Sequence, residues 1–260
     1  MTPCFVANWK MYKTGSEAEA YLRTFANQFA LLEPATEIVI APPATALAPL
    51  RACIDALALP VTLAAQNLHA APEGAYTGEL SARMLREAGC RYVLIGHSER
   101  RTHFGETDAQ ICLKIKAAGE AGLIPILCVG ETLQQRQMGE GESVVQRQVE
   151  VALGDNRPSE VVIAYEPVWA IGTGKTPSPT EVAAMHRHIR TSLAPFHNVR
   201  ILYGGSVTPQ NIAGFMQECD IEGALVGGQS LSVGLFMTII EQGMKSKMTR
   251  RHAAIGVASA

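Results

Sequence analysis

The sequence predicts an α/β fold in which eight parallel strands close into a single-domain (β/α)8 barrel. Short apolar runs alternate with longer segments of helical periodicity, and the alternation repeats eight times along the chain. No linker or change of composition interrupts this pattern before about residue 243. The length of 260 residues fits the prediction, because such barrels commonly take about 250 residues as one domain.

The strands are predicted from short apolar runs, rich in β-branched residues, that turn residues bound on both sides. Such runs lack a polar face, which is typical of parallel strands that are covered on both sides. The predicted strands are 4–8, 37–41, 61–65, 92–96, 124–129, 161–165, 200–203 and 224–227.

The helices are predicted from apolar residues that recur at helical spacing between these runs. They are 16–32, 45–58, 79–88, 107–121, 142–153, 180–194, 209–218 and 232–242, and Gly243 is expected to end the last one as its C-cap. An open doubly wound sheet is the alternative. No G-x-G-x-x-G follows the first strand, however, and eight repeats suit closure better.

Composition excludes several classes of protein. The chain has 22 Lys and Arg against 24 Asp and Glu, a net charge of −2, whereas gripping nucleic acid or an anionic membrane requires a dense cationic face. Its apolar runs are too short to cross a bilayer, and Met1 leads almost directly into a strand. We therefore expect a cytoplasmic protein.

The six cysteines lie apart without metal-ligand spacing, which favours free thiols and no metal site.

The last seventeen residues differ from the rest. The segment 244–260, MKSKMTRRHAAIGVASA, contains four Lys and Arg residues and no acid. We expect residues 1–243 to form the barrel and 244–260 to be a basic C-terminal extension, disordered or helical, that is solvated or makes a weak electrostatic contact.

Polar or glycine-rich segments follow five of the predicted strands, and the carboxyl ends of barrel strands form the reactive face. Glu166 lies in an apolar stretch, so it is expected to be poorly hydrated and a stronger base than in water. His97 precedes a turn that, if helical, favours a neutral imidazole. Lys10 follows Asn8 at the end of the first strand. Taken singly, each could instead be a surface or structural residue.

Two further features indicate an anionic ligand and a moving segment. The pairs 204–205 and 227–228 are both Gly-Gly, and they would let backbone N–H groups approach a phosphate, although tight turns are the alternative. The segment 167–177, PVWAIGTGKTP, has proline at both ends and is expected to act as a lid. It is not a P-loop, because Trp169 stands where the first glycine belongs. Nor do residues 204–208 form a nucleophile elbow, because Thr208 replaces its second glycine.

Taken together, these residues resemble the triosephosphate isomerase family over about residues 4–243. The resemblance rests on seven blocks in the family's order: ANWKM at 7–11, AQN at 65–67 with TGELS at 77–81, IGHSERR at 95–101, CVGET at 128–132, AYEPVWAIGTGKTP at 164–177, YGGSV at 203–207 and LVGGQSL at 225–231. It implies a homodimeric TIM barrel of glycolysis and gluconeogenesis that interconverts dihydroxyacetone phosphate and D-glyceraldehyde 3-phosphate without cofactor or metal.

The resemblance also implies roles for particular residues. Glu166 would be the base that forms an enediol(ate), His97 the electrophile, Lys10 the cation near the substrate and Asn8 its polar neighbour. In triosephosphate isomerases, a carboxylate base beside a neutral imidazole is the established description of the site. The remaining implied residues are Glu99 and Ser98 in support; Gly172, Ser206, Gly227 and Gly228 at the phosphate; Thr77 at the dimer contact; and Pro167, Val168, Trp169, Ala170, Ile171, Gly172, Thr173, Gly174, Lys175 and Thr176 in the lid.

Two other functions stay open from the sequence. One is a different phosphosugar isomerase or epimerase on the same barrel, and the other is a non-catalytic phosphate-binding barrel. Tyr12 and Gln229 depart from the residues usual in the family, and Gln229 is expected to point along the helix that follows rather than crowd the phosphate.

Overall fold

The protein was analysed as a computed structural model, which describes the whole chain except residues 30–35, 155, 157, 173–174, 194–198 and 258–260. Eight parallel strands form a closed barrel in sequence order, with β1 hydrogen-bonded to both β2 and β8. The predicted fold class is confirmed. The strands are β1 Cys4–Asn8, β2 Glu37–Ala41, β3 Val61–Ala65, β4 Cys90–Ile95, β5 Ile124–Val129, β6 Val162–Tyr165, β7 Arg200–Tyr203 and β8 Gly223–Val226.

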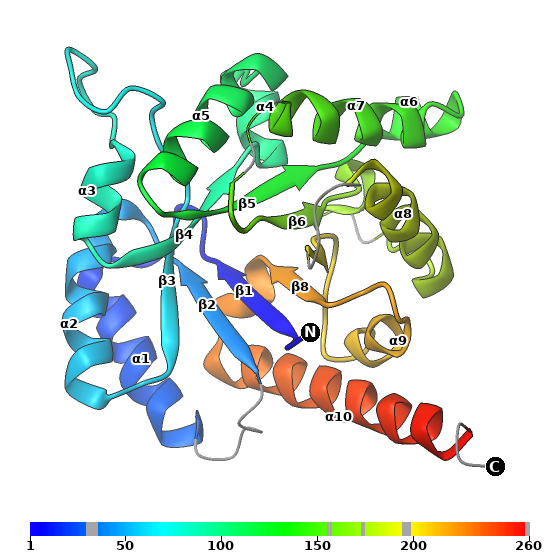
Figure 1. Cartoon of the computed structure of the whole chain (residues 1–260). Helices are drawn as coiled ribbons and strands as arrows, with labels where there is room; N and C mark the ends of the chain where they lie inside the picture. Colours follow the sequence, from blue (N-terminus) through cyan, green and yellow to red (C-terminus); the bar gives the residue numbers. More distant parts are fainter. Residues whose placement is uncertain (30–35, 155, 157, 173–174, 194–198, 258–260) are drawn as a thin grey trace.

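Helices surround the barrel (Figure 1). They are α1 Gly15–Phe29, α2 Leu47–Leu57, α3 Ala82–Glu87, α4 Ser98–Phe104, α5 Asp108–Glu120, α6 Leu133–Gln137, α7 Gly141–Leu153, α8 Pro179–Ser192, α9 Ile212–Gln217 and α10 Val233–Val257, with short 3-10 turns at Ala44–Ala46, Val168–Ala170 and Gly228–Leu231. None of the helices in the described part of the chain combines the length and hydropathy needed to cross a membrane.

The apolar residues of each strand divide between two cores. In β1, Cys4 and Val6 belong to the cluster inside the barrel, whereas Phe5 and Ala7 belong to the cluster between the barrel and its helices. This alternation follows from the two-residue period of a strand. Because both faces are buried, β1 reads in the sequence as a continuous apolar run, which is why the strands could be predicted.

Beyond shifts of a few residues at helix ends, such as those of α3 and α9, the observed helices differ from the predicted ones in two ways. The structure contains α4 and α6 as separate short helices, which the apolar periodicity did not identify because short helices show too few turns to reveal a period. The prediction that α10 ends at Gly243 was wrong, since the helix continues through it to Val257. A Cβ atom at Gly243 would lie 2.8 Å from Cζ of Phe5, so this glycine allows close packing and does not end the helix.

Candidate active site

A cavity of about 400 Å³ opens at the carboxyl ends of the strands. It brings together the residues predicted to act on the reacting carbons and those predicted to bind phosphate: Asn8, Lys10, His97, Glu166, Gly172, Ser206, Gly227 and Gly228. They lie at or just after the ends of five strands, β1, β4, β6, β7 and β8, so parallel closure of the barrel is what assembles them. Gln229 also lines this cavity.

Glu166 is held directly after β6 at the cavity wall. Its side chain is 3% exposed, its Oε2 accepts the N–H of Ser98 at 3.0 Å, and its Oε1 lies 3.0 Å from Nε2 of His97. The backbone of Gly204 passes so close to Glu166 that a side chain at this position would not fit. A Cβ atom at Gly204 would lie 2.8 Å from Cγ of Glu166. Gly204 therefore makes room for the carboxylate, a role that the sequence did not separate from phosphate binding.

The pKa of Glu166 is lowered, not raised as the sequence predicted. Burial by itself raises this pKa, but the facing His97 imidazole, the Ser98 N–H and Lys10 lower it by more. The sequence reasoning was right that the carboxylate is poorly hydrated. The predicted direction of the pKa shift was wrong because the apolar residues next to Glu166 in the sequence are not the groups that face its two carboxylate oxygens.

His97 is the N-cap residue of α4, and its Nδ1 accepts the backbone N–H of Glu99 at 3.2 Å. A nitrogen that accepts an N–H carries no proton, so Nε2 is the nitrogen that donates to Glu166 in this geometry, which is the neutral tautomer. Burial lowers the pKa of His97, yet the Glu166 carboxylate raises it and the net direction is upward. Two groups therefore act on the ring in opposite directions: the Glu99 N–H at the start of α4 favours the neutral form, as predicted for a helix terminus, and the Glu166 carboxylate favours the charged form.

Lys10 adopts a left-handed backbone conformation, with φ of 51°. Asn8 stabilises this turn by accepting the Lys10 N–H at 3.0 Å, and Gln66 donates to the Lys10 carbonyl at 2.8 Å. The Nζ atom contacts Oε1 of Glu99 at 2.6 Å. A Cβ atom at Gly227 would lie 3.5 Å from Cε of Lys10, so the cation extends along the floor of the cavity beside the eighth strand.

The loops after β7 and β8 form the other end of the cavity. Ser206 follows the Gly-Gly pair of β7, and its Oγ donates to the carbonyl of Ala170 at 2.5 Å. The Ser206 carbonyl in turn accepts from Nδ2 of Asn211 at 2.8 Å. The predicted phosphate loop and the predicted lid are therefore already in contact, and Asn211 fixes the loop from behind.

The segment after β6 continues from Glu166 into a 3-10 turn at Val168–Ala170. Ile171, Gly172 and Thr176 line the cavity, whereas Thr173 and Gly174 lie outside the described residues. Lys175 is exposed. The predicted lid thus borders the site through Ile171, Gly172 and Thr176.

Glu131 is a residue of this site that the sequence analysis missed. It is fully buried, and its carboxylate accepts from Nε1 of Trp169 at 2.8 Å and from the OH of Tyr165 at 3.1 Å. The guanidinium of Arg136 stacks on Trp169, 4.6 Å from the ring centroid, and lies 3.6 Å from Glu131. Glu131 thus anchors the base of the lid. Its position just after the fifth strand, within the CVGET block, was the available signal.

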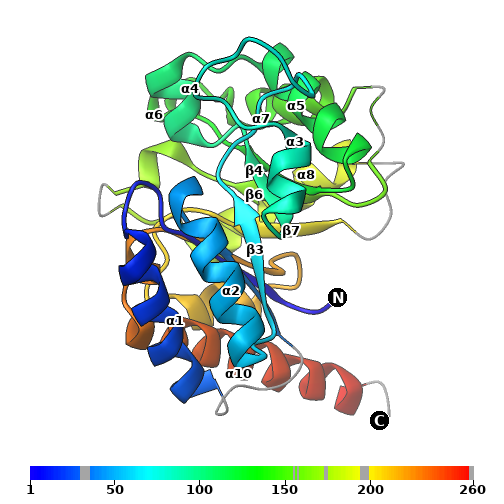
Figure 2. The same cartoon turned by 90° about the vertical axis from the view of Figure 1, so that its left-hand side faces the viewer.

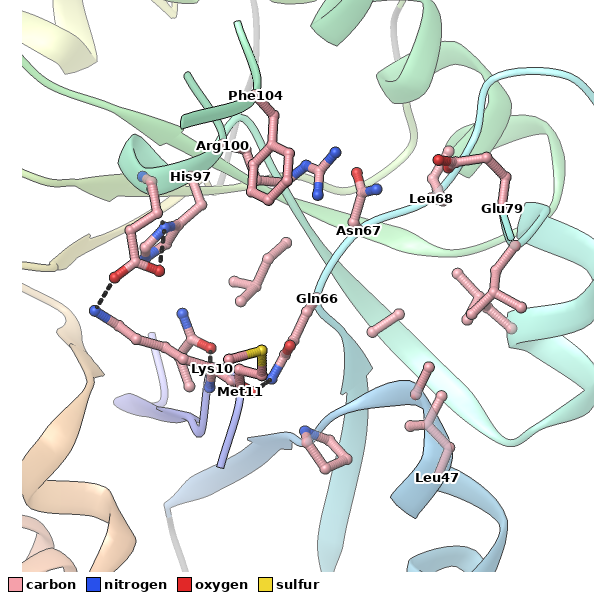
Figure 3. Close-up of a pocket in the computed structure, with 18 of the residues that line it drawn as sticks. Lys10, Met11, Leu47, Gln66, Asn67, Leu68, Glu79, His97, Arg100 and Phe104 are labelled. Atoms are coloured by element: carbon pink, nitrogen blue, oxygen red, sulfur yellow. Dashed lines mark hydrogen bonds and ion pairs between the residues drawn. The ribbon is translucent and has the colours of Figure 1, made fainter. Parts of the chain in front are cut away.

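A second cavity, of about 390 Å³, lies beside the first. Figure 3 shows Lys10 and His97 at one end of it and Glu79 at the other. Thr77 is exposed in the loop between β3 and α3. Its neighbours Gly78 and Glu79 line this second cavity together with Asn8 and Lys10, but Thr77 itself does not.

Within the described ranges, no three His, Cys, Asp or Glu side chains form a group that could hold a metal ion.

Comparisons with known proteins identify the family of this chain. The profile of the triosephosphate isomerase family matches residues 3–243. Triosephosphate isomerases of Chloroflexus aurantiacus and Symbiobacterium thermophilum are each 48% identical to this chain over 247 residues, covering 92% of it and 98% and 95% of their own lengths. The crystal structure of triosephosphate isomerase from Bartonella henselae superposes with a TM-score of 0.83 at 39% identity, covering 93% of this chain and 99% of that one. The chain therefore belongs to the triosephosphate isomerase family and is an isomerase.

Proposed function

We propose that this chain interconverts dihydroxyacetone phosphate and D-glyceraldehyde 3-phosphate through an enediol(ate) intermediate. The observation that carries the proposal is that Glu166, His97 and Lys10 line one cavity with Ser206 and the Gly-Gly turn after β8. A carboxylate base, a neutral N–H donor, a cation and a phosphate-sized anion site are the groups that proton transfer next to a carbonyl requires.

The proposed isomerisation moves one proton between two adjacent carbons. Glu166 takes a proton from the carbon beside the carbonyl, and the electron pair of that C–H bond forms the C=C bond of the enediolate. The negative charge gathers on the carbonyl oxygen, where the Nε2–H of His97 and the ammonium of Lys10 stabilise it. Return of the proton to the adjacent carbon, with the hydroxyl proton moving between the two oxygens, completes the isomerisation.

The Glu166 carboxylate must leave its present contacts to act in this way. Both of its oxygens are engaged by His97 and by Ser98. Bound substrate would compete for the His97 donor, and loss of that contact would remove an influence that now lowers the pKa of Glu166. Substrate binding would therefore free the base and strengthen it in the same step. Glu99 would hold Lys10 in place through their contact.

Phosphate binding is assigned to backbone N–H groups around Gly172, Ser206, Gly227 and Gly228. All four residues line the cavity. Binding energy from this remote group would be used to close the segment 167–176 over the reacting carbons. Glu131 and Trp169 would then form the fixed end about which that segment moves.

A homodimer is part of the proposal. Large apolar side chains are exposed around the second cavity, among them Met11 at 94% and Phe104 at 70%, and Tyr76 at 49% lies in the loop that carries Thr77. Such a cluster favours burial against another surface. We infer that the Thr77 loop of one subunit reaches the second cavity of its partner. The cytoplasmic location, the place in glycolysis and gluconeogenesis and the absence of a cofactor remain predictions.

The test is a coupled assay with D-glyceraldehyde 3-phosphate, run with and without a metal chelator. Rapid formation of dihydroxyacetone phosphate that the chelator does not alter is expected. No turnover, together with binding of inorganic phosphate, would instead support a non-catalytic barrel. Chelator-sensitive activity, or turnover only of a larger sugar phosphate, would support another isomerase or an epimerase.

A further inference from the structure

The C-terminal helix extends beyond the part of the chain that matches the family. The match ends at residue 243, whereas α10 continues to Val257. Figures 1 and 2 both show α10 running along one side of the barrel, and Figure 1 shows α9 beside its second half. We call residues 244–250 the C-terminal brace, because its side chains contact the barrel.

The brace is docked and is not a solvated tail. Met244 is 5% exposed and Lys247 is 8% exposed. The Oγ of Ser246 donates to the carbonyl of Ala213 in α9 at 2.7 Å. The exposed residues of the same segment are Lys245, Met248 and Thr249, which occur at helical spacing on the other face. The expectation of a solvated extension therefore does not hold for these turns.

Lys247 makes the most specific of these contacts. Its Nζ donates to the carbonyls of Glu218 at 3.2 Å and Ile221 at 2.6 Å. Glu218 is the C-cap residue of α9, and Ile221 lies just before β8. The last carbonyls of a helix have no partners within the helix, and a buried cation is favourable at that negative end. Lys247 thus fixes the connection between α9 and β8.

That connection lies between the two halves of the proposed phosphate site. At the other end of α9, the Asn211 side chain donates to the Ser206 carbonyl at 2.8 Å and accepts the Thr208 N–H at 2.8 Å. Beyond the connection, β8 leads directly to Gly227. The brace therefore holds α9, whose N-cap residue Asn211 fixes the loop of Ser206, and the connection to β8, the strand that leads to Gly227.

We propose that Lys247 is a positioning residue: by fixing α9 to β8 it sets the geometry of the Ser206 and Gly227 loops, and so the affinity of the site for phosphate. The ligand named here rests on the proposed function. The device belongs to the segment that the family match does not cover, and it acts through α9 and Asn211 without touching substrate.

The test compares Lys247→Met with Lys247→Arg and with Lys245→Met as the matched control. Methionine keeps the length of the side chain and removes its donors; Lys245 carries the same charge on the same helix but is exposed. For Lys247→Met we expect the dissociation constant of inorganic phosphate and the KM for D-glyceraldehyde 3-phosphate to rise together by about threefold to tenfold, the range that chains of packed and hydrogen-bonded residues carry. We expect kcat to change little, Lys247→Arg to restore affinity, and Lys245→Met to match the parent.

A double-mutant cycle tests the route. If Lys247 acts through α9, its effect on phosphate affinity and that of Asn211→Ala will be non-additive. Additive effects would overturn the route through Asn211, and with it the proposal.

Two results for Lys247→Met would also overturn the proposal: a lower melting temperature with unchanged phosphate affinity, or a loss of affinity that Lys245→Met reproduces. If Lys247→Met does not fold, Ser246→Ala replaces it as the test, because this variant removes only one neutral hydrogen bond to α9. Weaker phosphate binding is again expected, and unchanged phosphate affinity would again overturn the proposal. Parent enzyme that binds phosphate without isomerising triose phosphates would refute the proposed function, while the phosphate constants would still decide the role of Lys247.

Discussion

Oε1 of Glu166 lies 3.0 Å from Nε2 of His97, so the proposed base and the proposed electrophile are hydrogen-bonded to each other. This contact explains both pKa directions: the carboxylate raises the pKa of the imidazole against burial, and the imidazole lowers that of the carboxylate against burial. A ligand oxygen that takes the His97 donor would separate the two groups. In the proposed mechanism, ligand binding would therefore release the base.

Glu166→Gln is expected to lower kcat by about 10²-fold to 10⁴-fold, the usual contribution of a positioned general base. The amide keeps the shape and can still accept the Ser98 N–H that now reaches Oε2 at 3.0 Å. Inorganic phosphate should therefore bind nearly as in the parent, and folding should be retained. Steady-state kinetics and a phosphate titration check this, and an unchanged kcat would remove Glu166 from the chemical step.

His97→Gln is expected to reduce turnover with little effect on the melting temperature. The imidazole is buried, but its contacts are with Glu166 and the Glu99 N–H at the cavity wall, not with the core of the barrel. Glutamine can supply an N–H, yet without the fixed ring it should not hold that donor over the developing oxyanion. Thermal unfolding and kcat, measured side by side, separate the two roles: full turnover would mean that the imidazole is structural.

The sequence predicted which residues converge at the strand ends. It could not predict the properties that depend on side chains facing each other from distant parts of the chain. Asn8, Glu166 and Gly227 were predicted to converge because parallel closure alone brings strand ends together. The direction in which the pKa of Glu166 shifts depends on His97, which lies 69 positions away in the sequence. The apolar residues next to Glu166 therefore could not predict it. Glu131 was missed for the same reason, since its partners Tyr165 and Trp169 come from another strand and the lid.

The length of α10 was mispredicted because a glycine near a helix end has two opposite uses. Gly243 can terminate a helix by adopting a left-handed conformation, or it can let the helix pass close to another element. The sequence favours the first, and the contact with Phe5 reveals the second. Only the packed structure distinguishes them.

Shortening the segment 170–174 is expected to divert part of each turnover to the release of inorganic phosphate. Ala170 contacts Ser206, and Ile171 and Gly172 line the cavity, so a shorter segment could not cover an intermediate there. An enediolate phosphate that meets water can eliminate phosphate, and exclusion of water prevents this side reaction. The ratio of free phosphate to isomerised product measures the effect, and an equal ratio in variant and parent would contradict the lid.

His186 should make the stability of the fold depend on pH on the acid side. It is fully buried in α8, its Nδ1 lies 3.0 Å from the carbonyl of Asp220, and its ring packs edge-on against Tyr165. Burial lowers the pKa of His186 to about 4 from an ordinary value of 6.5. Between these values the unfolded chain binds a proton that the folded chain does not, so this stability is present above pH 6.5 and is lost as the pH falls towards 4.

The lowered pKa of His186 predicts that about 3 kcal/mol of the free energy of unfolding is lost between pH 6.5 and pH 4. His186→Asn keeps a donor near Nδ1 but cannot titrate, so it should flatten this part of the pH dependence even though it opens a cavity and lowers stability at pH 7. His103→Asn is the control, because His103 is exposed and its loss should leave the pH dependence as in the parent. Urea unfolding at pH 7, 5.5 and 4.5, at one protein concentration, gives the comparison. Equal slopes in His186→Asn and the parent would show that the buried ring is not what weakens the fold in acid.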